Sequence, residues 1–149
     1  MPDKRTVEKA REDKREGKSA MTQAGEFVKE QIDKIRRGVH GARSTRQAIA
    51  IGLSEARRAG VDLPPPRKGK RSTRKSAKYA YEVGQGKRKP RRRPRVARAV
   101  KNALKREPRS TASRKALSRQ ARSAAKRRSA SQRSAAAKKA ARTRARRAE

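Results

Sequence analysis

The chain of 149 residues carries 48 Lys and Arg side chains against 13 Asp and Glu, which gives a formal net charge of +35. Only 31% of its residues are hydrophobic and 41% are charged, so its apolar surface can supply one small core at most. It has no cysteine, which excludes disulfides, thiolate zinc sites and cysteine nucleophiles. A chain with this charge repels itself and needs a polyanionic partner, and nucleic acid is the abundant polyanion of the cell.

The charge is distributed unevenly along the chain. Residues 1–62 hold 15 bases and 10 acids, a net charge of +5, whereas residues 63–149 hold 33 bases and 3 acids, a net charge of +30. The run Pro64 to Pro66 follows the first part, and consecutive prolines stop a helix because they lack backbone donors. We therefore expect a small helical module over residues 1–66 and a basic arm, defined as residues 67–149, after it.

Two helices are predicted in the first half of the module. The first, over about residues 4–16, mixes acids and bases on all sides and is expected to be exposed and marginal. The second covers about residues 23–37, and Gly38 stands where a glycine that ends a helix belongs. Its apolar residues recur at helical spacing: Ala24, Phe27, Val28, Ile32 and Ile35.

A third helix is predicted over about residues 45–59. It begins with Ser44-Thr45-Arg46-Gln47, which matches the capping box that satisfies free backbone donors at a helix start. Small residues at positions 48, 52 and 56 would let this helix approach the preceding one closely. The module is thus predicted to be a helical hairpin, and the fold class mostly α.

The basic arm is expected to be largely disordered, or helical only when a polyanion neutralises it. Residues 67–109 are rich in Gly, Pro, Lys and Arg, which predicts a basic linker with short helices. Residues 110–149 consist mainly of Ala, Ser, Lys and Arg, which is typical of a low-complexity tail. Alanine favours helix there, while neighbouring positive charges oppose it.

Several stretches of the module resemble a family of uncharacterised small basic bacterial proteins, sometimes labelled histone-like or plasmid-stabilisation proteins. The similar stretches are Gly17 to Ser19, Thr22 to Val28, His40 to Ser54 and Ala56 to Val61. The pattern from Ala112 to Ala121 is similar too, and the tail resembles the tails of linker histones. The family has no established activity that the resemblance could carry over to this chain.

Clusters of Lys and Arg are the candidate nucleic-acid-binding residues. Arg outnumbers Lys by 30 to 18, which suits bidentate contacts to phosphate. The candidates are Arg43, Arg46, Arg57, Arg58, Lys87, Arg88, Lys89, Arg91, Arg92, Arg93, Arg95, Arg114, Lys115, Lys126, Arg127, Arg128, Lys138 and Lys139. The alternative for these residues is a solvated basic tail without a dedicated partner.

No residue pattern predicts catalysis, a metal site or a cofactor. His40 is the single histidine, and without a second histidine or a cysteine it is expected to be a plain turn residue. Tyr79 and Tyr81 could stack on an unpaired base, but packing or simple exposure is the favoured interpretation. We therefore expect a protein that is not an enzyme.

The composition favours a nucleoid-associated protein that binds DNA phosphates without reading sequence. One alternative is a protein-interaction or dimerisation module, tethered to DNA by the arm, with a partner surface formed by Phe27, Ile32, Ile49 and Leu53. Another is an RNA-binding or ribosome-associated protein, because a basic arm serves both nucleic acids. No apolar run approaches the roughly 20 residues of a membrane span, and no secretion signal is evident, so the cytoplasm is the expected location.

Overall fold

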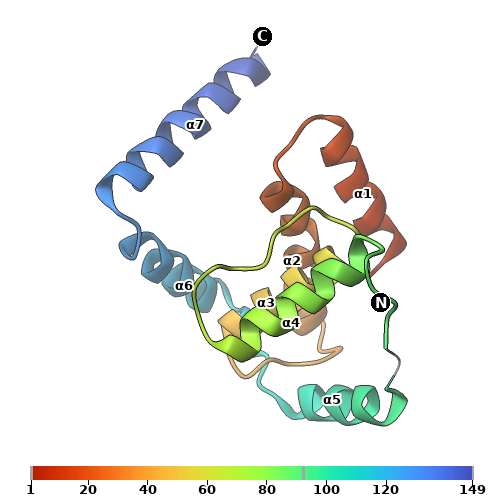
Figure 1. Cartoon of the computed structure of the whole chain (residues 1–149). Coiled ribbons are helices and arrows are strands. Elements are labelled where there is room, and N and C mark those ends of the chain that lie inside the picture. Colours follow the sequence, from red (N-terminus) through yellow and green to blue (C-terminus); the bar gives the residue numbers. More distant parts are fainter. Residues whose placement is uncertain (1, 92, 149) are drawn as a thin grey trace. The chain divides into compact units, whose positions relative to one another are not determined.

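The computed structural model describes residues 2–91 and 93–148 and is built from helices (Figure 1). In order, the helices are α1 (Lys4–Arg15), α2 (Ala20–Arg36), α3 (Thr45–Arg58), α4 (Arg71–Gly84), α5 (Pro94–Arg106), the short 3₁₀ helix η1 (Ser110–Ala112), α6 (Arg114–Lys126) and α7 (Ala130–Ala148). They form two compact units. The N-terminal unit extends to Ser113, well beyond the proline run, and the C-terminal unit begins at Arg114.

Side-chain caps define where the helices of the N-terminal unit begin. The Ser44 hydroxyl accepts a hydrogen bond from the Gln47 backbone N–H at 3.2 Å, as the capping box predicts. The Gln47 side chain accepts from the backbone N–H of Arg43 at 2.7 Å, one residue earlier than expected. At the start of α2, the Ser19 hydroxyl accepts from the Thr22 backbone N–H at 3.3 Å. Both caps satisfy donors that the first turn of a helix leaves unpaired.

The prediction that Gly38 ends the second helix is confirmed. Gly38 has a φ of 77°, a left-handed conformation that glycine adopts without strain. Its N–H donates to the Ile35 carbonyl at 3.0 Å, and the Val39 N–H donates to the Lys34 carbonyl at 3.0 Å. These two bonds make the Schellman motif, which satisfies carbonyls at the end of a helix. The same pair of bonds ends three other helices, at Gly17, Gly60 and Gly86.

The core of the N-terminal unit lies where α1 and α3 pack against α2. Phe27 is completely buried there, together with Ala24 and Ala56. The helix α1 is less exposed than its sequence predicts, because Ala10 is buried in this core and Val7 is partly buried against it. Small apolar residues thus suffice to hold a helix whose remaining surface is charged.

Helices α2 and α3 cross at close range, as the small residues at positions 48, 52 and 56 predict. Ala48 and Ala56 are completely buried. A Cβ atom on Gly52 would lie 2.6 Å from the Cα atom of Val28 and 3.0 Å from the carbonyl oxygen of Phe27. The two backbones therefore meet at Gly52 with no room for a side chain.

Helix α4 lies alongside α3, although it follows the proline run (Figure 1). Its Ala77 and Ala80 are buried. Gly84 has no space for a Cβ atom, which would overlap the Arg57 carbonyl oxygen. The Tyr81 hydroxyl donates a 2.6 Å hydrogen bond to the Asp62 carboxylate. The face of α4 formed by small residues is therefore part of the folded unit.

The segment from Leu104 to Ala112 returns to the turn between α2 and α3. The N–H groups of Gly41 and Ala42 donate to the carbonyls of Leu104 and Pro108 at 2.7 and 3.2 Å. The Thr45 hydroxyl donates to the Thr111 carbonyl at 2.7 Å. Arg36 Nε donates to the carbonyl of Ala112, a residue with no exposed surface. Four hydrogen bonds to backbone carbonyls thus fasten this segment to the hairpin.

The expectation of a largely disordered arm after residue 66 is wrong. Residues 67–109 contain α4 and α5, and residues 110–148 contain η1, α6 and α7. Packing on α3 orders α4, while α6 and α7 consist mainly of Ala, Arg, Lys and Ser, and the first three of these have high intrinsic helix propensity. Salt screens exposed charges, so repulsion between neighbouring bases opposes helix formation in α6 and α7 less than expected.

Candidate nucleic-acid interface

Exposed bases recur every three or four residues along α4, on the side opposite to the one that packs on α3. They are Arg71, Arg74, Lys75 and Lys78, and we call them the α4 basic face. A helix rises 1.5 Å per residue, so the seven steps from Arg71 to Lys78 span about 10 Å. This length is close to three base-pair steps of about 3.4 Å rise along the axis of a DNA duplex. The face therefore offers four cations over a length comparable to three base-pair steps of a duplex.

Sequence reasoning missed the α4 basic face, because the proline run was interpreted as the end of the folded part. A signal was present in the sequence. The small residues Ala77, Ala80 and Gly84 repeat at helical spacing and alternate with bases at the same spacing. This pattern is typical of an amphipathic helix whose packing face is narrow.

The loop after α4 holds a second group of exposed bases: Lys87, Arg88, Lys89 and Arg91. The prediction of a basic linker did not include the contacts of this loop with α4. The guanidinium of Arg88 lies over the Tyr79 ring, 5.2 Å from the centroid, and donates to the Glu82 carboxylate at 3.2 Å. The Arg91 backbone N–H donates to the Tyr79 hydroxyl oxygen at 2.7 Å. The loop is thus fastened next to the α4 basic face.

The assignment of Arg57 to phosphate binding is not kept. Its side chain is buried, with 7% of the residue exposed. Its Nε donates to the Leu63 carbonyl at 3.0 Å, and its Nη2 donates to the Pro64 carbonyl at 3.3 Å. Burial lowers the pKa of the guanidinium, but an arginine remains charged at every physiological pH. Arg57 therefore holds the chain after α3 in place, and its donors face the protein.

The other candidates in the N-terminal unit are exposed, but they do not form one cluster along the chain. Arg43 and Arg46 lie at the start of α3, and Arg58 lies in its last turn. Arg93 and Arg95 lie at the start of α5. Arg92 lies outside the residues that the structure describes.

The candidates in the C-terminal unit are all exposed. Arg114 and Lys115 lie in the first turn of α6, and Lys126, Arg127 and Arg128 lie where α6 ends. The remaining two, Lys138 and Lys139, lie within α7. Neither α6 nor α7 contains an acidic residue, so both helices present uncompensated positive charge.

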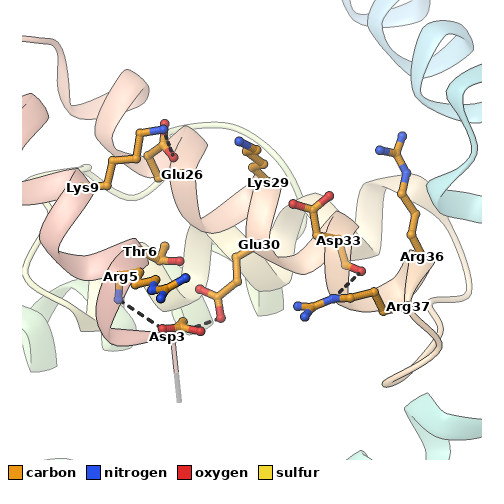
Figure 2. Close-up of a pocket in the computed structure, with 10 residues that line it drawn as sticks. All are labelled: Asp3, Arg5, Thr6, Lys9, Glu26, Lys29, Glu30, Asp33, Arg36 and Arg37. Carbon is orange, nitrogen blue, oxygen red and sulfur yellow. Dashed lines mark hydrogen bonds and ion pairs between the residues drawn. The ribbon is translucent and has the colours of Figure 1, made fainter.

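A cleft between α1 and α2 has a different charge pattern (Figure 2). Bases and acids alternate around it, and several are paired. Lys9 lies 3.4 Å from the Glu26 carboxylate, and the Asp3 backbone N–H donates to Glu30 at 3.0 Å. Since four carboxylates line this cleft, it is a poorer site for phosphate than the α4 basic face.

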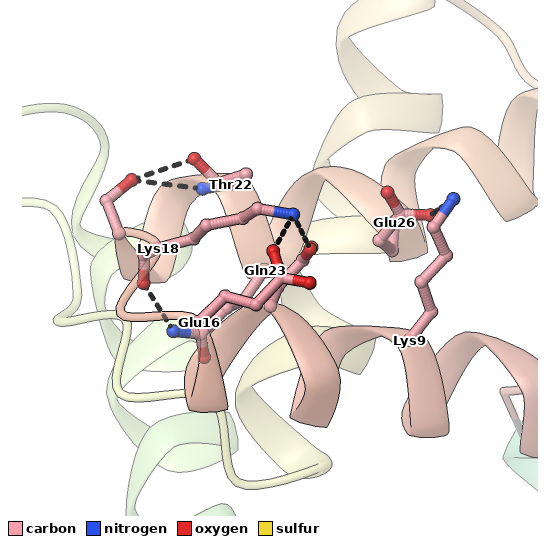
Figure 3. Close-up of polar contacts among 8 residues, drawn as sticks. Lys9, Glu16, Lys18, Thr22, Gln23 and Glu26 are labelled. Carbon is pink, nitrogen blue, oxygen red and sulfur yellow. Dashed lines mark hydrogen bonds and ion pairs between the residues drawn. The ribbon is translucent and has the colours of Figure 1, made fainter. Parts of the chain in front are cut away.

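Lys18 shows the same self-neutralisation at the turn between α1 and α2 (Figure 3). Its ammonium lies 2.7 Å from the Asp13 carboxylate and 2.6 Å from that of Glu16. The hydrogen bond to Asp13, followed by that to Glu16, raises the pKa of Lys18 above its ordinary value of 10.5. Acids of the first two helices thus neutralise neighbouring bases, whereas α4 carries one acid, Glu82.

The predicted partner surface is largely internal. Phe27 is completely buried and Ile32 is 6% exposed, so neither can meet a partner in this structure. Ile49 and Leu53 are half-buried. Leu53 packs against the core and lines an apolar groove that also includes Ile51 and Val100. The correction follows from the tight α2–α3 crossing, which encloses the large side chains of α2.

His40 lies in the turn between α2 and α3, as predicted, and has a structural contact there. Its Nε2 lies 3.1 Å from Gln31 Oε1, and the Gln31 amide donates to the Glu55 carboxylate at 2.6 Å. These bonds link the turn to both helices. Within residues 2–91 and 93–148, no three acidic or histidine side chains are grouped so that they could hold a metal ion.

Together, the fold and the site define an all-helical, strongly basic protein with ordered cationic faces. Residues 4–68 match a family of unknown function (DUF6496), a stretch that covers α1 to α3 and ends before α4. That description includes no histone-like or plasmid-stabilisation function, so this part of the expected resemblance is not supported. No curated protein and no solved structure matches the chain. Among the described residues, no helix combines the length and apolarity that a membrane span requires.

Proposed function

We propose that this protein binds DNA through its phosphates without reading sequence, as a nucleoid-associated protein of the cytoplasm. The observation that carries the proposal is the display of exposed, acid-poor basic faces on ordered helices from α4 onward. The formal charge of residues 63–149, +30, is concentrated on these helices and the loops between them. No catalytic step forms part of the proposal.

Two physical terms favour this ligand. Phosphate neutralisation releases condensed counterions from DNA, which supplies free energy independently of sequence. Arg presents paired donors that match two phosphate oxygens, and it is the commoner base in this chain, 30 against 18 Lys. An ordered helix loses less conformational entropy on binding than a disordered arm does, so the same charges bind more strongly.

The proposal excludes base-specific recognition as the main source of affinity. Helix α3 uses Ala48, Gly52 and Ala56 for packing against α2, and this face is not available to read base edges. The α4 basic face carries Arg and Lys at helical spacing but no Asn or Gln that would pair with adenine. Contacts of this kind position a protein on a duplex and carry no direct base information.

Fluorescence anisotropy of the full chain with labelled duplexes tests the proposal. We expect two unrelated DNA sequences to bind with equal affinity. On a log–log plot between 50 and 200 mM salt, roughly six or more contacts give a slope steeper than about −5. A shallow slope, or a marked preference for one sequence, would contradict it. An RNA duplex and poly-glutamate serve as competing polyanions, and tighter binding of either would replace DNA as the ligand.

A further inference from the structure

A carboxylate lies between two cations at the C-terminal end of α4. One oxygen of Glu82 accepts from the Arg88 guanidinium at 3.2 Å, and the other lies 3.8 Å from the Lys78 ammonium. The side chains of Arg88 and Lys78 are 57% and 70% exposed. A single anionic group therefore faces two exposed cations at the point where the α4 basic face meets the following loop.

Tyr79 fixes the position of Arg88 in this group of charged residues. Its ring lies beneath the Arg88 guanidinium, and its hydroxyl oxygen accepts from the Arg91 backbone N–H. A cation over an aromatic face is held by the electrostatic attraction of the ring. The hydrogen bond from the Arg91 backbone N–H fixes the part of the loop that follows Arg88. Arg88 is therefore oriented before any ligand arrives.

We infer that Lys78 and Arg88 form a phosphate subsite, with Tyr79 as a positioning residue and Glu82 as the internal anion that a phosphate displaces. The ligand is a phosphodiester group of the nucleic-acid backbone, so the inference rests on the proposed function. Lys78 belongs to the α4 basic face, and the subsite therefore continues that row of cations toward Lys87 and Lys89.

The exchange of Glu82 for phosphate is favourable for two reasons. Exposed ion pairs contribute little to stability because water already solvates both charges, so Arg88 and Lys78 lose little when they leave the carboxylate. A backbone phosphate offers Arg a bidentate contact and adds the release of counterions. Glu82 then turns to solvent, where its charge is hydrated. In the free protein the same carboxylate reduces the repulsion between Lys78 and Arg88.

Five substitutions in the full chain, measured with a labelled 30-base-pair DNA duplex at 100 mM salt, test the subsite. Glu82→Gln removes the competing anion, and we expect binding to tighten by about 3- to 10-fold. Glu12→Gln changes the net charge equally at an exposed position on α1, and it should tighten binding by less than about 2-fold. Because both variants change the net charge equally, the difference between their affinities measures the effect of the position of the charge.

The tyrosine variants separate positioning from general stability. Tyr79→Leu removes the ring and the hydroxyl and should weaken binding by about 3- to 10-fold. Tyr79→Phe keeps the ring under Arg88 and should lose less. The matched control is Tyr81→Phe. Tyr81 lies on the same helix as Tyr79, and the substitution removes its hydrogen bond to Asp62, which precedes α4 and is not part of the basic loop. It should leave affinity unchanged, and thermal unfolding followed by circular dichroism verifies that each variant is folded.

A direct readout is the NMR signal of the Arg88 Nε–H group during titration with the duplex. We expect this signal to shift to saturation in the wild type and in Tyr81→Phe. If the wild type binds DNA with a steep salt slope, but Glu82→Gln behaves as Glu12→Gln and Tyr79→Leu behaves as Tyr81→Phe, the subsite is refuted while the proposed function stands. If the wild type fails to bind with such a slope, both proposals are refuted.

Discussion

Replacement of Gly52 by alanine tests the close crossing of α2 and α3. The new Cβ atom would lie 2.6 Å from Val28 Cα and 2.8 Å from the Val28 backbone nitrogen, whereas ordinary contact begins at 3.4 Å. Both obstructing atoms belong to a helix backbone, so the helices must separate by several tenths of an ångström. Overpacking of this kind costs about 1–3 kcal/mol, and backbone obstruction places Gly52→Ala toward the upper end. The higher helix propensity of alanine returns about 1 kcal/mol.

We therefore expect Gly52→Ala to destabilise the protein by about 1–2 kcal/mol in urea unfolding followed by circular dichroism at 222 nm. The matched control is Gly25→Ala on α2, where a Cβ atom meets nothing within 4 Å. That variant gains helix propensity without obstruction and should be stabilised by up to about 1 kcal/mol. Equal stabilisation of both variants would refute the close crossing.

Three further predictions follow from buried contacts. Arg57→Ala should cost about 2–4 kcal/mol, because it removes charge-assisted hydrogen bonds to the Leu63 and Pro64 carbonyls, whereas exposed Arg58→Ala should change stability by under about 0.5 kcal/mol in urea unfolding. Gly41→Ala places a Cβ atom into the Glu107 carbonyl, so tryptic cleavage after Arg106 and Arg109 should accelerate several-fold while the core stays folded. Unchanged cleavage would show that this segment is not fastened to the turn. Burial raises the pKa of Glu30, but hydrogen bonds from Lys34, Thr6 and the Asp3 backbone outweigh it and leave the pKa below 4.5. Its ionised form thus stabilises the fold above pH 4.5, and this stability is lost as the pH falls through the folded pKa. In urea titrations from pH 7 to pH 3, the stability difference between wild type and Glu30→Gln should shrink; a constant difference would contradict this.

Features with local causes could be predicted from the sequence. The end of α2 at Gly38 follows from the conformational freedom of glycine, and the start of α3 follows from the hydroxyl of Ser44 and the amide of Gln47. The close helix crossing follows from the small residue at Gly52, because its spacing from Ala48 and Ala56 places all three on one face.

Long-range features could not be predicted in the same way. The segment from Leu104 to Ala112 is held through its backbone carbonyls, which every residue has, so its docking leaves no side-chain signal. Arg57 has the same residue type as its exposed neighbour Arg58, and only the folded chain shows that its donors face inward. The order of α4 depends on its contact with α3, across a proline run that indicates a boundary.

The sequence indicated that the candidate site consists of basic residues, but it indicated only part of their positions. Clustered bases indicated Lys87 to Lys89 and the exposed residues of α6 and α7, but attention to clusters missed bases that are separated along the sequence and adjacent on a helix. The α4 basic face consists of such bases, since Arg74 and Lys75 lie three and four residues after Arg71, and Lys78 lies four and three residues after them. A helical period, applied to charges as it is to apolar residues, would have found it.

The most direct test of the account compares two quadruple variants of the full chain that have the same net charge. One replaces Arg71, Arg74, Lys75 and Lys78 with Gln, and the other replaces four exposed bases of α1 and α2, namely Lys4, Lys14, Arg15 and Lys29. Each neutralised phosphate contributes about −0.9 to the salt slope, so loss of the α4 basic face should make the slope roughly 3 to 4 units shallower on duplex DNA. The α1–α2 variant should keep nearly the wild-type slope. Equal losses in the two variants would contradict the account, because total charge, and not its placement on α4, would then determine binding.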